Sequence, residues 1–303
     1  FEYNPQSKAP KFEAYLNRVL PDIKLQNILA EFLGYVFIKH GHKGLKLEKA
    51  LLLYGMGANG KSVFFDVVNA LFGNQNTSTY SLHNLTNERG EYRAKIANKL
   101  VNYASEINGK LESSTFKQLV SGEPVEARAL YGQPYTINQY AKLIFNCNEL
   151  PKDVEHTNAY FRRFLIIPFN VIISEEEKDI QLADKIIDNE LSGVFNWVLD
   201  GLNRLLKQKK FTHSEVVKQA VEDYKSKSDS VKMFIDENNY HPSPKDYKLI
   251  KDLYGSYRIY CQEDGFYPVN KSNFIKRLGS FGIIVKRIGM GNVAYLTDMP
   301  SPF

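Results

Sequence analysis

Residues 50–62, ALLLYGMGANGKS, decide the fold, because an apolar run leads directly into a glycine-rich turn. The apolar run predicts a strand, and an amphipathic pattern from Lys61 to about Phe72 predicts a helix. The turn, Gly55–Ser62, fits G-x-x-x-x-G-K-[ST] at every fixed position. Glycines let the backbone wrap closely round phosphate groups, and the following helix start adds its positive dipole end. The stretch therefore predicts a phosphate-binding loop.

The residue types of this loop indicate ATP and Mg²⁺ as cofactors. Lys61 is expected to reach the β- and γ-phosphates, and the Ser62 hydroxyl is expected to ligate Mg²⁺. The predicted nucleotide-binding residues are Gly55, Gly57, Ala58, Asn59, Gly60, Lys61, Ser62 and Val63. The alternative is a chance glycine-rich turn, which the strand–turn–helix setting disfavours.

Three further apolar runs, at residues 99–104, 141–147 and 164–169, predict strands with helical patterns between several of them. Strands that alternate with helices indicate an α/β fold with a mainly parallel sheet.

Polar residues beside these runs are candidates for catalysis. Glu106 follows the first run, where an acid could hold Mg²⁺ and activate water; the alternative is a surface Glu. Asn148 follows the second, where it could orient water or sense the γ-phosphate, although Asn is also common in turns. Arg163 precedes the third. With Arg162 it forms a basic pair, of which one Arg could act as an arginine finger toward an adjacent subunit; the alternative is that both are surface residues in salt bridges with acidic side chains.

The flanking regions predict three domains. The opening residues read as two amphipathic helices that pack without chemistry of their own. Residues 175–224 read as helical, and Lys225–Ser230 (KSKSDS) as a polar linker. The predicted domains are residues 1–44 (helical subdomain), 45–225 (ATPase core with trailing helices) and 226–303 (a terminal module).

The sequence pattern of the terminal module predicts three helices and a hairpin that turns at Gly289–Asn292. Three helices followed by a hairpin are typical of a winged-helix domain. Nine basic and five acidic residues lie between His241 and Phe303, so most of the chain's net charge of +5 lies here. The predicted DNA-contacting residues are Lys271, Asn273, Lys276 and Arg277 on a helix and Lys286 and Arg287 on the wing. The alternative is a module that only packs against neighbouring subunits.

Composition restricts the class of protein. The 303 residues are 43% hydrophobic and 24% charged, as in ordinary globular proteins. No apolar run is long enough to cross a bilayer, which predicts no membrane contact. Two distant cysteines and the absence of a signal pattern fit the cytoplasm. Because the first residue is Phe1 and not Met, we expect a piece of a longer protein.

The combined order of motifs resembles the superfamily III helicases. The likeness is to the C-terminal half of phage and plasmid primase–helicases, related to the poxvirus replicative nucleoside triphosphatase. It rests on Asn59 before Gly60-Lys61-Ser62, Glu106, Lys117–Arg128 (KQLVSGEPVEAR), Phe145–Pro151 with Asn148, and Phe161–Phe164 with Arg163. One departure is Ser105, where many members have a second acid. Either Glu106 serves alone, or another acid such as Glu123 assists.

The resemblance implies an AAA+-like fold and a ring, usually a hexamer, through which DNA passes. It also implies a hairpin in the channel, here Val125–Ile137 with Gly132 as its tip. Arg128 could then meet phosphate and Tyr131 could stack on a base; the alternative is an ordinary solvated hairpin. A primase domain upstream on the full-length chain is a further expectation.

Three functions remain open. The first is an ATP-driven ring helicase or translocase that binds single-stranded and forked DNA and unwinds DNA in the replication of a phage, plasmid or mobile element. The second is an origin-binding initiator or loader, which uses ATP to switch assembly without unwinding. The third, a P-loop kinase, is disfavoured by the motif order and the basic terminal module.

Overall fold

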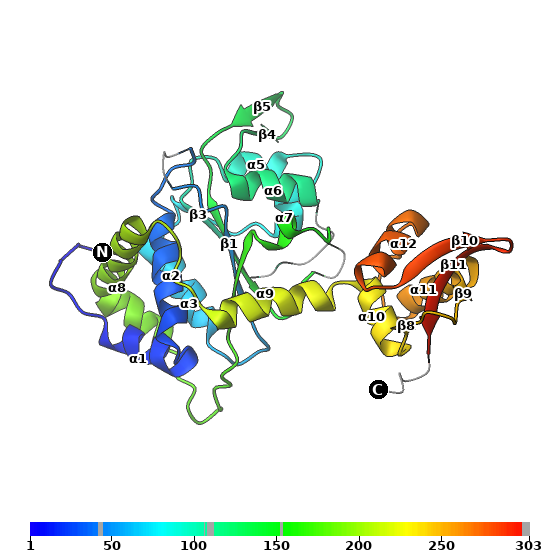
Figure 1. Cartoon of the computed structure of the whole chain (residues 1–303). Helices are drawn as coiled ribbons and strands as arrows, with labels where there is room; N and C mark the ends of the chain where they lie inside the picture. Colours follow the sequence, from blue (N-terminus) through cyan, green and yellow to red (C-terminus); the bar gives the residue numbers. More distant parts are fainter. Residues whose placement is uncertain (42–44, 106, 108–111, 152–153, 299–303) are drawn as a thin grey trace. The chain divides into compact units, whose positions relative to one another are not determined.

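The computed structural model describes residues 1–41, 45–105, 107, 112–151 and 154–298, which divide into two compact units (Figure 1). The first unit spans residues 1–151 and 157–222, and the second spans residues 223–303 with the short segment that ends at His156. Residues 1–41 therefore belong to the same unit as the glycine-rich loop.

A five-stranded sheet lies at the centre of the first unit, and every pair of neighbouring strands is parallel. The strands, in spatial order, are β2 (Thr77–Ser78), β3 (Val101–Ala104), β6 (Lys142–Cys147), β1 (Ala50–Tyr54) and β7 (Phe164–Pro168). Leu51, Leu52 and Leu53 are completely buried between flanking strands, which explains the uninterrupted apolar run. The predicted α/β class with a mainly parallel sheet is confirmed.

Helices surround this sheet. They are α1 (Pro10–Val19), α2 (Ile23–Tyr35), α3 (Lys61–Phe72), α4 (Leu82–Thr86), α5 (Glu91–Lys95), α6 (Ser113–Ser121), α7 (Asn158–Phe161) and α8 (Leu182–Gln208). Helix α9 (Glu215–Lys227) begins in this unit and ends in the second. The long helix α8 packs against both α2 and α3. A Cβ atom on Gly201 would lie 2.3 Å from the Ala30 carbonyl carbon, so only glycine permits this close approach of α8 to α2.

A buried carboxylate fixes the end of α8 to α2. Glu31 is fully buried, and its oxygens accept hydrogen bonds from Arg204 Nε at 2.6 Å and Gln208 Nε2 at 3.0 Å. The backbone N–H and hydroxyl of Thr212 donate to the same carboxylate at 2.7 and 2.6 Å. A buried charge is tolerated only when it is paired in this way.

A two-stranded antiparallel hairpin stands apart from the central sheet. It consists of β4 (Val125–Arg128) and β5 (Pro134–Ile137), and it projects from the body of the first unit (Figure 1). Its strands lie inside the range that the sequence predicts for a hairpin.

The second unit has its own aromatic core, in which Phe274 stacks on Tyr257 with ring centroids 4.7 Å apart. Its elements are α10 (Ser230–Glu237), β8 (His241–Pro242), β9 (Lys248–Leu249), α11 (Ile250–Glu263), α12 (Lys271–Ser280), β10 (Ile284–Ile288) and β11 (Gly291–Thr297). β10 and β11 form an antiparallel hairpin. The order of three helices followed by a hairpin agrees with the sequence pattern.

The predicted polar linker at Lys225–Ser230 is wrong. Helix α9 continues to Lys227, and α10 begins at Ser230. The Ser228 hydroxyl donates to the Tyr224 carbonyl at 2.7 Å, and Asp229 caps α10. Small polar residues here terminate and begin helices, a role that composition alone does not distinguish from a linker. Among the described residues, no helix is long and apolar enough to cross a membrane.

We predict that Glu31→Ala destabilises the chain by about 3 kcal/mol, because it leaves the half-buried Arg204 and the Thr212 donors without their acceptor. Urea unfolding measures this directly, with the exposed Glu13→Ala as the matched control, expected to change stability by less than about 0.5 kcal/mol. Equal losses in the two variants would contradict an anchoring role for Glu31.

Candidate nucleotide-binding site

The glycine-rich loop connects β1 to α3, and helix α1 packs directly on it. Gly60 has φ +85°, a left-handed conformation that favours glycine. A Cβ atom at Gly60 would lie 2.9 Å from Val19 Cγ1 and 3.0 Å from Tyr15 Cε2. The Tyr15 hydroxyl donates to the Gly60 carbonyl at 2.8 Å. The opening helix, predicted only to pack, therefore holds the loop in shape.

Lys61 is buried, and its ammonium lies across the interior of the loop. Nζ donates to the Gly55 carbonyl at 2.5 Å, to the Met56 carbonyl at 3.2 Å and to Asn59 Oδ1 at 3.0 Å. Burial lowers the pKa of Lys61 from its ordinary value. These carbonyl partners hold the cation at the centre of a loop whose N–H groups are suited to phosphate.

Asn59 has a structural role that the sequence pattern does not specify. Its Nδ2 donates to the Phe169 carbonyl at 3.0 Å and also to the Met56 carbonyl. Phe169 follows the edge strand β7, so this amide ties the loop to a segment 110 residues away. The side chain of Asn59 thereby fixes both the loop and its lysine.

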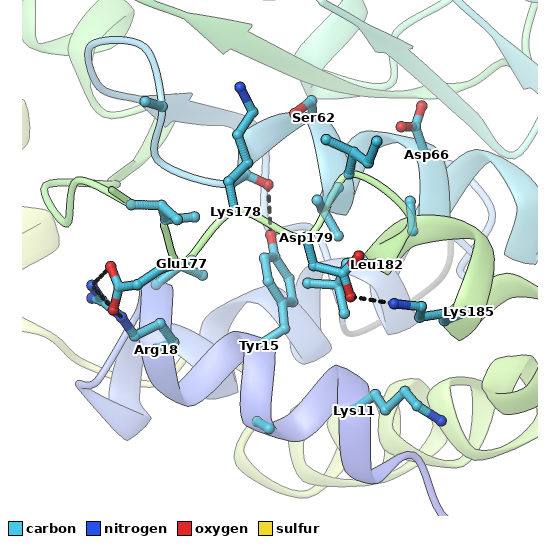
Figure 2. Close-up of a pocket in the computed structure, with 18 residues that line it drawn as sticks. Lys11, Tyr15, Arg18, Ser62, Asp66, Glu177, Lys178, Asp179, Leu182 and Lys185 are labelled. Carbon is cyan, nitrogen blue, oxygen red and sulfur yellow. Dashed lines mark hydrogen bonds and ion pairs between the residues drawn. The ribbon is translucent and has the colours of Figure 1, made fainter. Parts of the chain in front are cut away.

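A pocket of about 1090 Å³ opens beside the loop (Figure 2). It is lined by the loop and the start of α3, by one face of α1, and by the segment between β7 and α8. The lining residues are Lys11, Ala14, Tyr15, Arg18, Val19, Ala58, Gly60, Ser62, Val63, Asp66, Ile173, Glu177, Lys178, Asp179, Ile180, Leu182, Ala183 and Lys185. The volume is ample for a nucleoside.

Two ion pairs hold the segment between β7 and α8 at this pocket. Arg18 Nη2 lies 2.8 Å from Glu177 Oε2, and Lys185 Nζ lies 2.6 Å from Asp179 Oδ2, as Figure 2 shows. The backbone supports the same position, because the Ile173 N–H donates to the Ala58 carbonyl at 2.8 Å. No sequence pattern indicated this wall, which brings together residues far apart in the chain.

Asp66 is one helical turn beyond Ser62, so both side chains lie on the pocket face of α3 (Figure 2). Burial, with a smaller contribution from Asp184, raises the pKa of Asp66 above its ordinary value. The pocket therefore contains a carboxylate and a hydroxyl on one side and apolar surface from Val63 and Leu182 on another.

The neighbouring strands bring Asn148 to the edge of the sheet where the loop begins. The Gly55 N–H donates to the Cys147 carbonyl at 3.1 Å, and Asn148 is the next residue, with its side chain exposed. Asn146 instead is buried and accepts the Tyr103 hydroxyl at 2.8 Å. β3 ends at the same edge at Ala104, but Glu106 lies outside the described residues, so its predicted role stays a prediction.

The two arginines before β7 point in different directions. Arg163 is buried: Nη2 donates to Ser121 Oγ at 2.9 Å, Nη1 donates to the Ala159 carbonyl, and Glu48 lies 3.9 Å away. The side chain of Arg162 is 59% exposed and pairs with Glu48 at 2.8 Å. The outward guanidinium is thus that of Arg162, whereas the family resemblance indicated Arg163 as the finger.

Both arginines lie at the amino-terminal ends of the parallel strands, whereas the loop of their own chain lies at the carboxyl-terminal ends. Ala50 of β1 pairs with Phe164 of β7, and Tyr54 pairs with Pro168. The loop follows Tyr54, whereas the arginines precede Phe164, so a strand's length of about 15 Å separates them. Neither guanidinium is placed to reach a nucleotide on its own loop.

The β4–β5 hairpin presents an aromatic ring at its tip. Tyr131 is 94% exposed and has φ +60°. Arg128 Nε donates to the Gly132 carbonyl at 2.8 Å, which fixes the turn and leaves the guanidinium at the surface. Tyr131 and the predicted tip residue Gly132 therefore lie side by side at the turn of the hairpin.

The predicted DNA-contacting residues of the second unit differ in their exposure. The exposed ones are Lys271, Asn273 and Lys276 on α12 and Lys286 and Arg287 on β10. Arg277 is different, because its Nη1 is 3.1 Å from Asp229 Oδ1 and its side chain is only 19% exposed. In this structure the Arg277 guanidinium is held by a carboxylate of its own unit.

Comparisons with known proteins find a matching family model and a distantly related viral protein. Residues 53–163 match a family described as a family of unknown function, DUF5906. Over 247 residues, 73% of this chain, the sequence is 23% identical to a protein of Acanthamoeba polyphaga mimivirus named "Putative helicase L207/L206". The match spans 25% of that relative's length.

Two solved structures share the fold along nearly the whole chain. An apo structure of the NrS-1 C-terminal region (305–718) has a TM-score of 0.54 at 17% identity, covering 97% of this chain and 78% of that one. An A-form apo structure of the same region has a TM-score of 0.55 at 16% identity, with coverages of 97% and 78%. At this level of identity the likeness concerns the fold.

We predict that Gly60→Ala destabilises the nucleotide-free chain by about 2 to 4 kcal/mol, since it imposes a left-handed alanine and a clash with Tyr15. Gly57→Ala is the matched control in the same loop. Gly57 is outside the left-handed region, and a Cβ there meets no atom within 4 Å. Thermal unfolding distinguishes the two, and similar losses would contradict packing of α1 on Gly60.

Proposed function

We propose that this chain is an ATP-driven DNA helicase or translocase of the superfamily III type, with its ATP site shared between adjacent copies. The observation that carries the proposal is the loop of residues 55–62, in which buried Lys61 lies beside a nucleoside-sized pocket. The sequence relationship to a viral helicase and the likeness in fold to the NrS-1 C-terminal region support it.

The residues present fit ATP and Mg²⁺. The loop's backbone N–H groups and Lys61 would bind the β- and γ-phosphates, and the Ser62 hydroxyl with Glu106 would hold Mg²⁺. When bound, Mg²⁺ neutralises charge that develops on the phosphates. Asn148, next to the loop, would orient the attacking water. The pocket between α1 and residues 173–185 would take the base and ribose.

Arg162 is the arginine that we assign as the finger for a neighbouring copy. Its guanidinium is exposed and lies at the sheet edge away from its own loop. Arg163 would instead keep α6 and β7 in register through Ser121. An arginine supplied in trans stabilises the charge of the transition state. Such sharing requires assembly, and a closed ring, here expected to be a hexamer, satisfies every site.

DNA would be contacted by both units. Tyr131 at the exposed hairpin tip is suited to stack on bases of single-stranded DNA, with Arg128 near the phosphates. The second unit would act as a winged-helix domain that presents exposed α12 and β10 side chains to phosphates. An upstream primase domain on the full-length chain remains part of the proposal.

We predict that Arg162→Ala lowers ATP hydrolysis by about 10³-fold or more while ATP binding is retained, as for other arginine fingers. Lys61→Ala should lose ATP binding itself. Mixing the two inactive variants should restore activity in part, because an intact loop can then meet an intact arginine. A malachite-green phosphate assay measures each mixture.

Lys46→Ala is the control for this experiment, because it removes another cation from Glu48, at 3.0 Å, without removing the finger. Two results would contradict the assignment of Arg162. In the first, activity does not recover when the two variants are mixed. In the second, Arg162→Ala hydrolyses ATP normally, whereas a stably folded Arg163→Ala does not. Strand displacement on a forked duplex separates the helicase from a loader that only switches assembly.

We predict that Tyr131→Ala weakens binding of single-stranded DNA by about 1–3 kcal/mol, whereas Tyr131→Phe, which keeps the ring, retains it. Fluorescence anisotropy with a labelled oligonucleotide measures the change. Thermal stability should not alter, since Tyr131 is 94% exposed. Equal affinities of the Ala and Phe variants would rule out stacking by this residue.

A further inference from the structure

A short segment that interrupts the first unit in the sequence belongs to the second unit. Residues up to 151 and from 157 onward belong to the first unit, whereas the segment that ends at His156 belongs to the second. In sequence this segment lies between Asn148, beside the phosphate-binding loop, and Arg162, the assigned finger. Both flanks of the segment therefore lead to groups of the proposed ATP site.

His156 attaches the segment to the residues that precede α10 by a hydrogen bond from one ring nitrogen. Nε2 lies 2.6 Å from the Ser228 carbonyl oxygen, so Nε2 carries the proton and donates it. Nδ1 lies 3.7 Å from Asp229 Oδ2, and the side chain of His156 is only 9% exposed. A buried ring with contacts to two consecutive residues fixes both the position and the orientation of the segment.

Asp229 connects this histidine to α12. Its Oδ1 accepts the N–H groups of Val231 and Lys232 at 3.0 and 3.2 Å, which caps α10. The same oxygen lies 3.1 Å from Nη1 of Arg277 on α12, and the Asp229 side chain is 13% exposed. A continuous polar chain thus runs from α12 through Asp229 to His156.

We propose that His156 is a positioning residue that couples DNA binding by the second unit to the nucleotide site. The inference rests on the proposed function, because it requires α12 to meet DNA. A phosphate near α12 competes with Asp229 for the Arg277 guanidinium. A shift of Asp229 would move His156, and the described chain leads from His156 to Arg162.

Coupling of this kind is reciprocal: if DNA alters the nucleotide site, bound nucleotide alters DNA affinity by the same factor. The test measures the Kd of the full chain for a labelled forked oligonucleotide, with and without a non-hydrolysable ATP analogue and Mg²⁺. We expect the wild-type ratio of the two Kd values to lie in the range of about 5–150-fold.

His156→Ala should bring this ratio close to one while the Kd without nucleotide and the Kd for the analogue stay near wild type. His156→Gln keeps an N–H donor for Ser228 and should recover part of the ratio. Asp229→Asn retains the helix cap but lacks the carboxylate charge, so it should also lower the ratio of the two Kd values. This variant replaces His156→Ala in the test if His156→Ala does not fold. Lys248→Ala is the control, because it breaks the 3.0 Å Lys248–Asp298 pair elsewhere in the same unit.

A wild-type ratio in His156→Ala, or in a folded Asp229→Asn if His156→Ala does not fold, would overturn the inference. So would loss of DNA binding without nucleotide, because His156 would then serve binding and not coupling. A wild-type chain whose two Kd values are equal would overturn it as well. Failure of the proposed function is separate: it would appear as an absence of ATP hydrolysis, and the binding ratio does not depend on hydrolysis.

Discussion

The left-handed turn at Gly60, packed beneath Tyr15 and Val19 of α1, is the constraint on which the nucleotide site depends. It sets the direction in which α3 begins, and so the positions of Lys61 and Ser62. Asn59 holds the other side of the loop to Phe169. The loop is therefore fixed by the N-terminal helix and by the end of the edge strand. The same two regions continue into the walls of the adjoining pocket.

The parallel sheet separates the chemical groups of one chain. Asn148 lies at the edge where β1 ends, next to the loop, whereas Arg162 lies before β7 at the opposite edge. In a parallel sheet, a residue that follows one strand and a residue that precedes another lie at opposite ends of the strands, so they do not meet at one site. On the proposed function, this geometry makes hydrolysis depend on a second copy. It also gives the chain between Asn148 and Arg162, which contains His156, a place from which both groups can be affected.

Much of the fold could be predicted because its signals are local. The apolar runs predicted all but the shortest strand of the sheet, and Gly55–Ser62 predicted the loop with its lysine and serine. Side-chain direction could not be predicted, because it depends on distant partners. Ser121 turns Arg163 inward, Glu48 leaves Arg162 exposed, and Asp229 holds Arg277.

The pocket walls were missed for the same reason, since α1 and residues 173–185 meet only in the folded chain. The polar run at residues 225–230 misled because helix caps and linkers share a composition.

The most direct measurement is a structure of the full chain by electron microscopy, with Mg²⁺, a non-hydrolysable ATP analogue and single-stranded DNA. We predict a triphosphate held by the backbone of residues 55–62, with Arg162 of an adjacent copy at the γ-phosphate. A nucleotide enclosed by a single chain, with no guanidinium from a neighbour, would contradict it.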